Sequence, residues 1–291
     1  MAEEVAEAPR RRSVQCVSPK GLHRIAYREW GDARNRDVVV CVHGLTRNGR
    51  DFDELARALC GRYRVVCPDV AGRGDSDRLA DPRLYDLPQY VADMVTLIAR
   101  LDVETVGWVG TSMGGLIGMA LAAQSGSPIV RLVLNDVGPV IRLAALRRIA
   151  TYIGNTETFP TIEAAEAHVR FTNATFGPHS DAQWRQLTEA WMRKEADGSW
   201  RPNYDPRLAD AYRATLPDKD IELWPLYDAI RCATLVLHGE QSDLLSKNTT
   251  REMAARGPKA RVVEIKGVGH APTLMQPDQI ALVRDFLMDS P

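Results

Sequence analysis

A serine flanked by glycines, between an apolar run and a helical pattern, most restricts how this chain can fold. The run Val106–Val109 is rich in β-branched residues, as buried strands are, and a helix-like stretch follows at Leu116–Ala123. Between them stands Gly110-Thr-Ser-Met-Gly114. So sharp a turn strains the serine backbone and leaves no room for neighbouring Cβ atoms. The pattern predicts a nucleophile elbow with Ser112 at the positive end of a helix, although an ordinary glycine-serine turn would look the same.

Composition and charge are those of an ordinary soluble globular protein. The 291 residues are 45% hydrophobic and 26% charged, enough for one large domain or two small ones. A formal net charge of −1 provides no field that would attract nucleic acid or an anionic membrane. No apolar run approaches the roughly 20 residues that span a bilayer, and Met1–Arg12 lacks the apolar centre of a secretory signal. We therefore expect no nucleic-acid partner and no membrane span.

The cysteines indicate a reducing compartment. Their number, five, is odd, and no Cys-x-x-Cys pair occurs. Cys41 and Cys67 lie in or at the end of apolar strand-like runs, where a thiol usually acts as a small buried hydrophobic group. We expect a cytoplasmic protein without disulfides.

Strand-like and helix-like segments alternate over most of the chain. The turn signal Pro19-Lys-Gly21 joins the first two strands into an expected hairpin. Alternation of this kind predicts an α/β fold whose mainly parallel sheet is covered by helices on both faces. The predicted strands are Val14–Ser18, Leu22–Trp30, Val38–Val42, Tyr63–Cys67, Val106–Val109, Val130–Asn135, Ala233–Leu237 and Ala260–Ile265.

The alternation stops between residues 140 and 226. This stretch contains helix-like patterns, no strand-like run, and a cluster of tryptophans. We interpret it as an inserted helical cap, or lid, which would decide the substrates that reach Ser112. The predicted division is a disordered terminus at 1–11, a core at 12–139 and 227–291, and the cap at 140–226.

A base and an acid are expected beside the serine. A serine hydroxyl is a poor nucleophile without a positioned base, which a third group must orient. Asp243 and His270 each follow a predicted strand, although either alone could be an ordinary turn or capping residue. With Ser112 they give the chain order Ser, Asp, His that is expected for such a sheet. Asp136 also follows a strand and could take the place of Asp243, but we favour Asp243 because the acid usually follows the later strand.

Two backbone amides are expected to stabilise the charge that develops on the substrate carbonyl oxygen. One is that of Met113, directly after the serine, and the other is that of Leu45, in the loop after the strand Val38–Val42. Gly44 would let this loop approach the substrate closely. The dipeptide His43-Gly44 is equally compatible with a plain turn.

These residues together resemble the α/β-hydrolase fold family, in its esterase and lipase-like branch with a helical cap. The resemblance covers roughly residues 14–290 and implies a mostly parallel eight-stranded sheet. It also implies a carboxylic-ester hydrolase that works through an acyl-enzyme, with catalytic Ser112, Asp243 and His270 and without metal or cofactor. The expected supporting residues are His43, Gly44, Gly110 and Gly114. The remaining motif residues are Asp69-x-x-Gly72-x-Gly74-x-Ser76 and Gly269.

Some features separate this chain from other members of that family. Ser112 stands where haloalkane dehalogenases and epoxide hydrolases have an aspartate. The loop His43-Gly-Leu-Thr-Arg-Asn-Gly49 departs from the His-Gly-x-Gly-Pro-Gly of ring-cleavage hydrolases and many peptidases. Arg47 and Asn48 either line the entrance to the site or shape this loop, and we favour the second role. A carbon–carbon bond hydrolase or enol-lactonase and a non-enzymatic small-molecule sensor remain alternatives. The dense apolar and aromatic side chains of the cap favour a small, neutral, largely apolar ester or lactone. The sequence does not indicate an oligomeric state.

Overall fold

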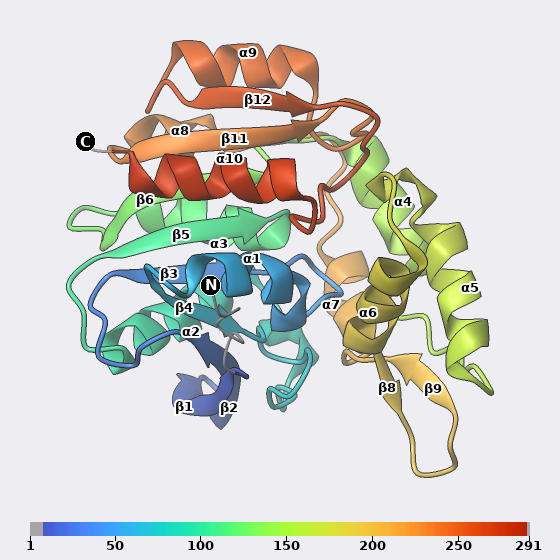
Figure 1. Cartoon of the computed structure of the whole chain (residues 1–291). Coiled ribbons are helices and arrows are strands. Elements are labelled where there is room, and N and C mark those ends of the chain that lie inside the picture. The colour runs from blue at the N-terminus through green and yellow to red at the C-terminus, as the bar shows by residue number, and fades with distance from the viewer. Residues whose placement is uncertain (1–7, 290–291) are drawn as a thin grey trace, which may run out of the picture.

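One mostly parallel sheet of eight strands organises this computed structural model, which describes residues 8–289 (Figure 1). The strand order is β1-β2-β4-β3-β5-β6-β11-β12, antiparallel from β1 to β4 and parallel from β4 to β12. This confirms the predicted fold class. The bounds are β1 Arg10–Ser18, β2 Gly21–Trp30, β3 Val38–Val42, β4 Arg64–Pro68, β5 Val106–Thr111, β6 Ile129–Asn135, β11 Ala233–Gly239 and β12 Arg261–Ile265.

Helices cover both faces of the sheet because its central strands are apolar on both sides. All five residues of β3 are buried, as a strand between two helical layers requires. Helices α1 and α10 pack on one face, and α2, α3, α8 and α9 contribute to the core on the other. Their bounds are α1 Asp53–Leu59, α2 Leu87–Arg100, α3 Met113–Ala122, α8 Trp224–Ala229, α9 Lys247–Ala255 and α10 Pro277–Met288.

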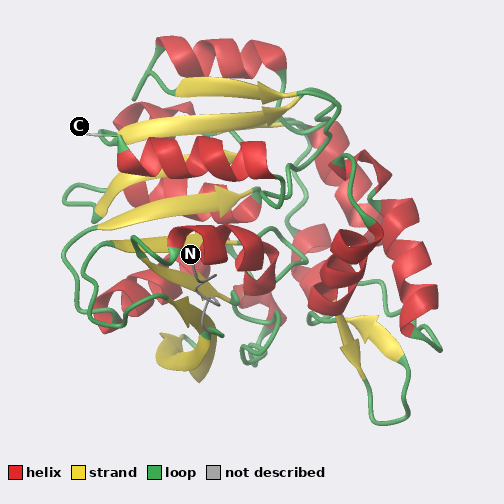
Figure 2. Ribbon diagram, in the orientation of Figure 1, coloured by secondary structure: helices red, strands yellow, loops and turns green. Residues whose placement is uncertain are grey.

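The segment 140–226 lies beyond the carboxyl ends of the parallel strands, and the arrowheads of these strands point toward it (Figures 1 and 2). Part of it has a hydrophobic cluster of its own, which includes Phe159, Trp184 and Trp191. The cap helices are α4 Leu143–Tyr152, α5 Ile162–Thr172, α6 Asp181–Trp191 and α7 Leu208–Ala214. Short 3-10 turns lie at Gly49–Phe52, Pro82–Leu84 and Ala174–Phe176.

The structure differs from the sequence prediction at two boundaries and in the content of the cap. Strand β1 begins at Arg10, inside the predicted disordered terminus, because Arg10 pairs with Glu29 of β2 in register and by an ion pair of 3.1 Å. Residues 1–7 of that predicted terminus lie outside the described residues. The cap contains short antiparallel strands where none was expected. A boundary at 226 would cut through α8, whose Tyr227 packs into the main core. The additional strand pairs are β7 Val140–Ile141 with β10 Ile221–Glu222, and β8 Met192–Lys194 with β9 Trp200–Pro202.

The cysteines and the helices add two observations on the chain's environment. All five cysteines are free thiols, and Cys41 and Cys67 are buried, as their apolar surroundings in the sequence predicted. Between residues 8 and 289, every helix is too short or too polar to span a bilayer.

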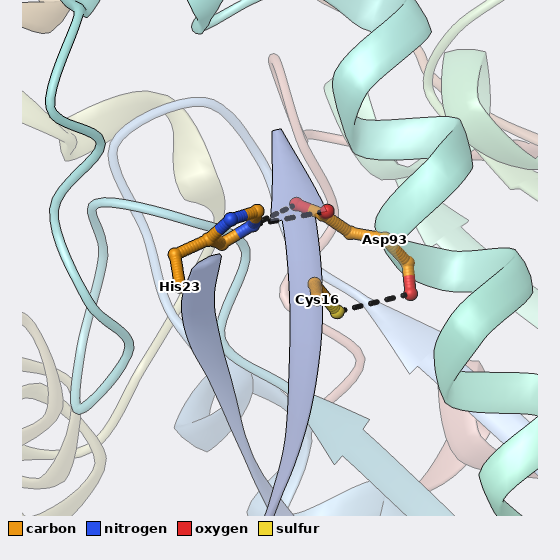
Figure 3. A group of neighbouring side chains, drawn as sticks. All are labelled: Cys16, His23 and Asp93. Atoms are coloured by element: carbon orange, nitrogen blue, oxygen red, sulfur yellow. Dashed lines mark hydrogen bonds and ion pairs between the residues drawn. The ribbon is translucent and has the colours of Figure 1, made fainter. Parts of the chain in front are cut away.

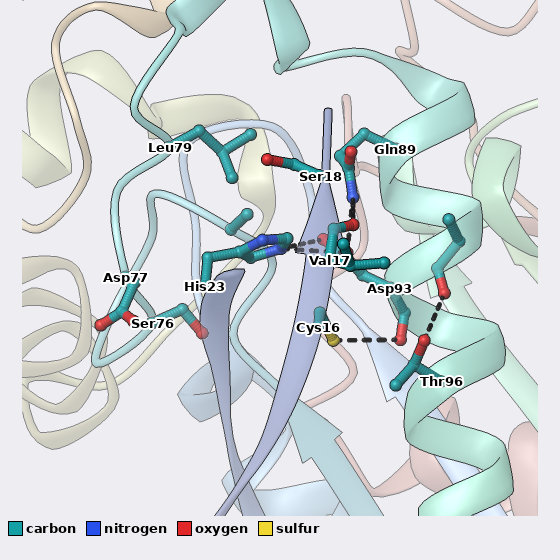
Figure 4. A network of polar contacts seen from close by, with 12 residues as sticks. Cys16, Val17, Ser18, His23, Ser76, Asp77, Leu79, Gln89, Asp93 and Thr96 are labelled. Carbon is teal, nitrogen blue, oxygen red and sulfur yellow. Dashed lines mark hydrogen bonds and ion pairs between the residues drawn. The ribbon is translucent and has the colours of Figure 1, made fainter. Parts of the chain in front are cut away.

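A buried polar network joins the β1–β2 hairpin to α2 (Figure 3). His23 Nε2 lies 3.0 Å from both carboxylate oxygens of Asp93, which is completely buried. Gln89 donates to the same carboxylate at 2.8 Å and to the backbone carbonyl of Val17 at 3.0 Å (Figure 4). Because a carboxylate away from water is costly unless it is paired and hydrogen-bonded, this network fixes how the hairpin sits on the helix.

Cys16 completes this cluster with a neutral thiol. One potential metal-ligand atom from each of Cys16, His23 and Asp93 lies within 4.8 Å of the other two. Thiol, imidazole and carboxylate groups all bind transition metals. The Cys16 Sγ is 3.8 Å from the backbone carbonyl of Asp93, and burial raises the pKa of the thiol to about 12. In this structure the three side chains form a hydrogen-bonded network.

Removing the carboxylate of this network should destabilise the fold without changing the turn at Ser112. We expect Asp93→Ala to lower the free energy of unfolding by about 2–4 kcal/mol, because His23 and Gln89 lose a buried charged partner. Asp218→Ala, at an exposed position of the cap, should change it by less than about 0.5 kcal/mol. Urea unfolding followed by circular dichroism measures both values. Equal stability of the two variants would show that the network contributes nothing.

Candidate active site

Ser112 stands at a sharp turn between β5 and α3. Its backbone has φ of 52° and ψ of −115°, a conformation that non-glycine residues rarely adopt. The flanking glycines allow it: a Cβ on Gly110 would lie 2.3 Å from the carbonyl oxygen of Gly114, and one on Gly114 would lie 1.9 Å from that of Val42. The local sequence therefore enforces the elbow geometry and leaves the Ser112 side chain partly exposed.

A continuous chain of hydrogen bonds links Ser112 to a histidine and a carboxylate. The Oγ of Ser112 lies 2.9 Å from Nε2 of His270, in the loop after β12. Nδ1 of the same ring lies 2.7 Å from Oδ2 of Asp136, directly after β6. An imidazole held in this way can accept the serine proton at Nε2 while it donates from Nδ1 to the carboxylate.

The carboxylate of Asp136 is completely buried and saturated with donors. Its Oδ1 accepts from the backbone N–H of Gly239 at 2.8 Å, and its Oδ2 also accepts from the hydroxyl of Ser242 at 2.6 Å. Both donors come from the end of β11 and the loop after it. That loop thus orients the acid, which itself belongs to the neighbouring strand β6.

The predicted pairing of Asp243 with His270 is wrong. Asp243 lies in the loop after β11, but its side chain is 49% exposed and binds Arg148 of α4, with contacts of 2.5 and 3.1 Å. The residue that reaches the acid position from this loop is Ser242, through its hydroxyl. Asp243 therefore points toward the cap helix α4. The carboxylate beside His270 is that of Asp136.

The two expected oxyanion donors border the serine. Met113 is the first residue of α3, where a backbone N–H has no partner within the helix. Gly44, next to Leu45, is so close that a Cβ on it would lie 3.7 Å from the Cβ of Ser112. The buried Arg73 holds both donor residues: it donates to the Leu45 carbonyl at 2.8 Å and contacts the Met113 sulfur at 3.5 Å. A pair of donors from Leu45 and Met113 stays a prediction that this arrangement favours.

His43 supports the loop as a neutral ring. Its Nδ1 donates to the Gly44 carbonyl at 2.7 Å, and its Nε2 accepts from the Val70 N–H at 2.9 Å. Burial lowers the pKa of His43 to about 3, so the ring stays uncharged at neutral pH. His43 therefore connects the loop after β3 to the loop after β4.

Sequence reasoning missed the side chains that hold these loops together. Asn135, completely buried, donates to the Thr111 hydroxyl at 2.9 Å and to the Pro272 carbonyl at 2.8 Å, joining the elbow to the histidine loop. Arg73 and Ser242 were also not predicted. The position of Asn135 at a strand end was the one available signal, because carboxyl ends of parallel strands meet at one edge.

The cap contacts the loop after β3 directly. Asn48 donates to the Ala190 carbonyl of α6 at 2.6 Å, and Arg47 donates to Oδ1 of Asn173 at 2.7 Å. The guanidinium of Arg47 also lies 3.6 Å from the ring centre of Trp191. These residues therefore join core and cap, in addition to the loop-shaping role that was expected of them.

A family model described as the alpha/beta hydrolase family matches residues 39–282. The chain belongs to the α/β-hydrolase family. Among solved structures, an alpha/beta hydrolase from Novosphingobium aromaticivorans superposes on this α/β hydrolase with a TM-score of 0.87. The two are 37% identical, over 96% of this chain and 98% of the other.

Two relatives of this α/β hydrolase carry more informative names. The 3-hydroxybutyrate-oligomer hydrolase of Cupriavidus necator is 52% identical over 97% of this chain and 99% of its own length. Esterase YbfF of Escherichia coli is 28% identical over 88% of this chain and 94% of its own length. Both names support ester hydrolysis as the activity.

Exchange of either aspartate for asparagine distinguishes the two candidate acids. We expect Asp136→Asn to lower kcat by about 10³–10⁴-fold, because the amide stabilises the wrong tautomer of His270. Asp243→Asn should change kcat by less than about threefold, since its carboxylate binds Arg148 at the surface. Initial rates on an aryl ester measure both effects. A larger loss for Asp243→Asn would restore the original prediction.

Proposed function

We propose that this protein is a serine hydrolase that cleaves carboxylic esters through an acyl-enzyme. The observation that carries the proposal is the chain of contacts from Ser112 to His270 at 2.9 Å and from His270 to Asp136 at 2.7 Å. Ser112 lies at the elbow expected for a nucleophile. The relatives of this protein include an oligomer hydrolase and an esterase.

The reaction follows from the placement of these groups. His270 removes the proton of Ser112, whose Oγ attacks the ester carbonyl, while the N–H groups of Leu45 and Met113 stabilise the oxyanion. Collapse of the tetrahedral intermediate breaks the ester bond, and His270 protonates the leaving alcohol. A water molecule, deprotonated by His270, then attacks the acyl-enzyme and releases the acid. Asp136 orients the imidazole throughout and stabilises its charged form.

We propose short oligoesters of hydroxy acids as the substrate class. The support is the relative that acts on 3-hydroxybutyrate oligomers, with 52% identity along almost the whole of both chains. Such a substrate is a small-molecule ester, as expected, but it ends in a carboxylate. We also place the reaction in the cytoplasm, because the five free cysteines fit a reducing compartment.

The other candidate functions use the same residues and are separated by turnover. A non-enzymatic sensor would bind esters without steady-state hydrolysis, and a carbon–carbon hydrolase would cleave vinylogous diketones in preference to esters. Among the residues at the site, none favours either alternative over ester hydrolysis. A single panel with an aryl ester, a 3-hydroxybutyrate dimer and a vinylogous diketone distinguishes all three.

Loss of the serine hydroxyl should abolish ester hydrolysis. We expect Ser112→Ala to fold normally and to lose several orders of magnitude in kcat, leaving at most about 10³–10⁴-fold acceleration over water. A serine-directed fluorophosphonate should label the wild-type protein at Ser112 only, which peptide mass mapping measures. The same probe should leave Ser112→Ala unlabelled. Labelling that survives the substitution would assign the nucleophile to another residue.

A further inference from the structure

Arg47 is a cation without a carboxylate partner beside the candidate active site. Among residues 8–289, its side chain forms one hydrogen bond, to Asn173, and lies over the ring of Trp191, but it forms no ion pair. A guanidinium carries five N–H donors, so most of its hydrogen-bonding capacity is unused. Among the described residues, some side-chain nitrogen and oxygen atoms are buried and lack a hydrogen-bond partner, but no atom of Arg47 is one of them. The free N–H groups of Arg47 therefore face accessible space.

The surroundings of Arg47 leave its charge poorly compensated. Burial lowers the pKa of its guanidinium, although Asp51, Tyr152 and Tyr204 act in the opposite direction. Asp51 is the acid in this group, and it accepts a hydrogen bond from the indole N–H of Trp191. Burial raises the pKa of Asp51 to about 6. A partly buried cation is costly without a partner in contact, so this position favours an anion from outside.

The aliphatic stem of Arg47 lies near Ser112. A Cβ built on Gly44 would be 3.7 Å from the Cβ of Ser112 and 3.9 Å from the Cγ of Arg47. Both side chains thus border Gly44, the neighbour of the expected oxyanion donor Leu45. From Cγ the Arg47 side chain extends to the cap, where Trp191 and Asn173 hold the guanidinium.

We propose that Arg47 binds the carboxylate of an anionic ester substrate and selects hydroxy-acid esters that carry this group on the alcohol side. The proposal rests on the proposed ester hydrolysis at Ser112. In a 3-hydroxybutyrate dimer, four covalent bonds separate the scissile carbonyl carbon from the terminal carboxylate carbon, about 5 Å when extended. A planar guanidinium pairs with a carboxylate through two parallel hydrogen bonds. Arg47 thereby fixes the orientation of the ester over the serine. The proposed substrate is then an anion, in place of the neutral ester expected from the sequence.

The test compares three esters that differ in charge and in its position. The first is the 3-hydroxybutyrate dimer, the second is the same dimer with a terminal carboxamide, and the third is p-nitrophenyl butyrate. We expect Arg47→Gln to lower kcat/KM for the acid dimer by about 10- to 100-fold, mainly through KM. The neutral carboxamide and the aryl ester should lose less than about threefold. The substrate preference for acid over carboxamide should disappear.

Control variants separate recognition from structure. Arg185→Gln removes an arginine of the cap that is paired with Glu163 and Glu166, and should leave the preference unchanged. Arg47→Lys keeps the charge and should retain part of the preference. Because the ratio between two esters does not depend on the folded fraction, partial unfolding of a variant does not obscure it.

The outcomes distinguish the two proposals. If the wild-type protein cleaves none of the three esters, the proposed function fails. If it cleaves esters but does not favour the acid dimer over the carboxamide, the role of Arg47 fails while the esterase stands. A loss that is equal for all three esters in Arg47→Gln would show that Arg47 only joins core and cap, and would likewise overturn the assignment.

Discussion

The close approach of the elbow to strand β3 is the constraint on which the site depends. A Cβ on Gly114 would lie 1.9 Å from the carbonyl oxygen of Val42, so only glycine allows α3 to begin there. The same approach places the loop after β3 beside Ser112, where a Cβ on Gly44 would lie 3.7 Å from the Cβ of Ser112. This one backbone contact therefore positions the proposed nucleophile, the expected oxyanion donors and Arg47.

The remaining geometry comes from parallel strands that end at a common edge. Asp136 follows β6, His270 follows β12, and the β11 loop between them supplies Ser242 as a donor to the acid. Three separate loops therefore form one hydrogen-bonded unit. In this unit the imidazole of His270 already contacts both Ser112 and Asp136, as preorganisation for the proposed reaction requires.

The sequence predicted those parts of the site that local chemistry specifies. Glycines at 110 and 114 and apolar strands such as Val38–Val42 have local physical causes, so their positions could be derived. The choice between Asp136 and Asp243 could not, because both follow strands and only the path of the β11 loop decides which turns outward. For the same reason the partners of Arg47, which lie more than a hundred residues further along the chain, were beyond local patterns.

The acyl-enzyme is the most direct test of the central claim, because it records both the nucleophile and the substrate class. Wild-type protein is mixed with a 3-hydroxybutyrate trimer, quenched in acid during turnover, digested, and mapped by mass spectrometry. The account predicts a hydroxybutyryl ester, of one or more units, on the peptide that contains Ser112. Turnover of the trimer without any adduct at Ser112, or with the acyl group on another residue, would contradict it.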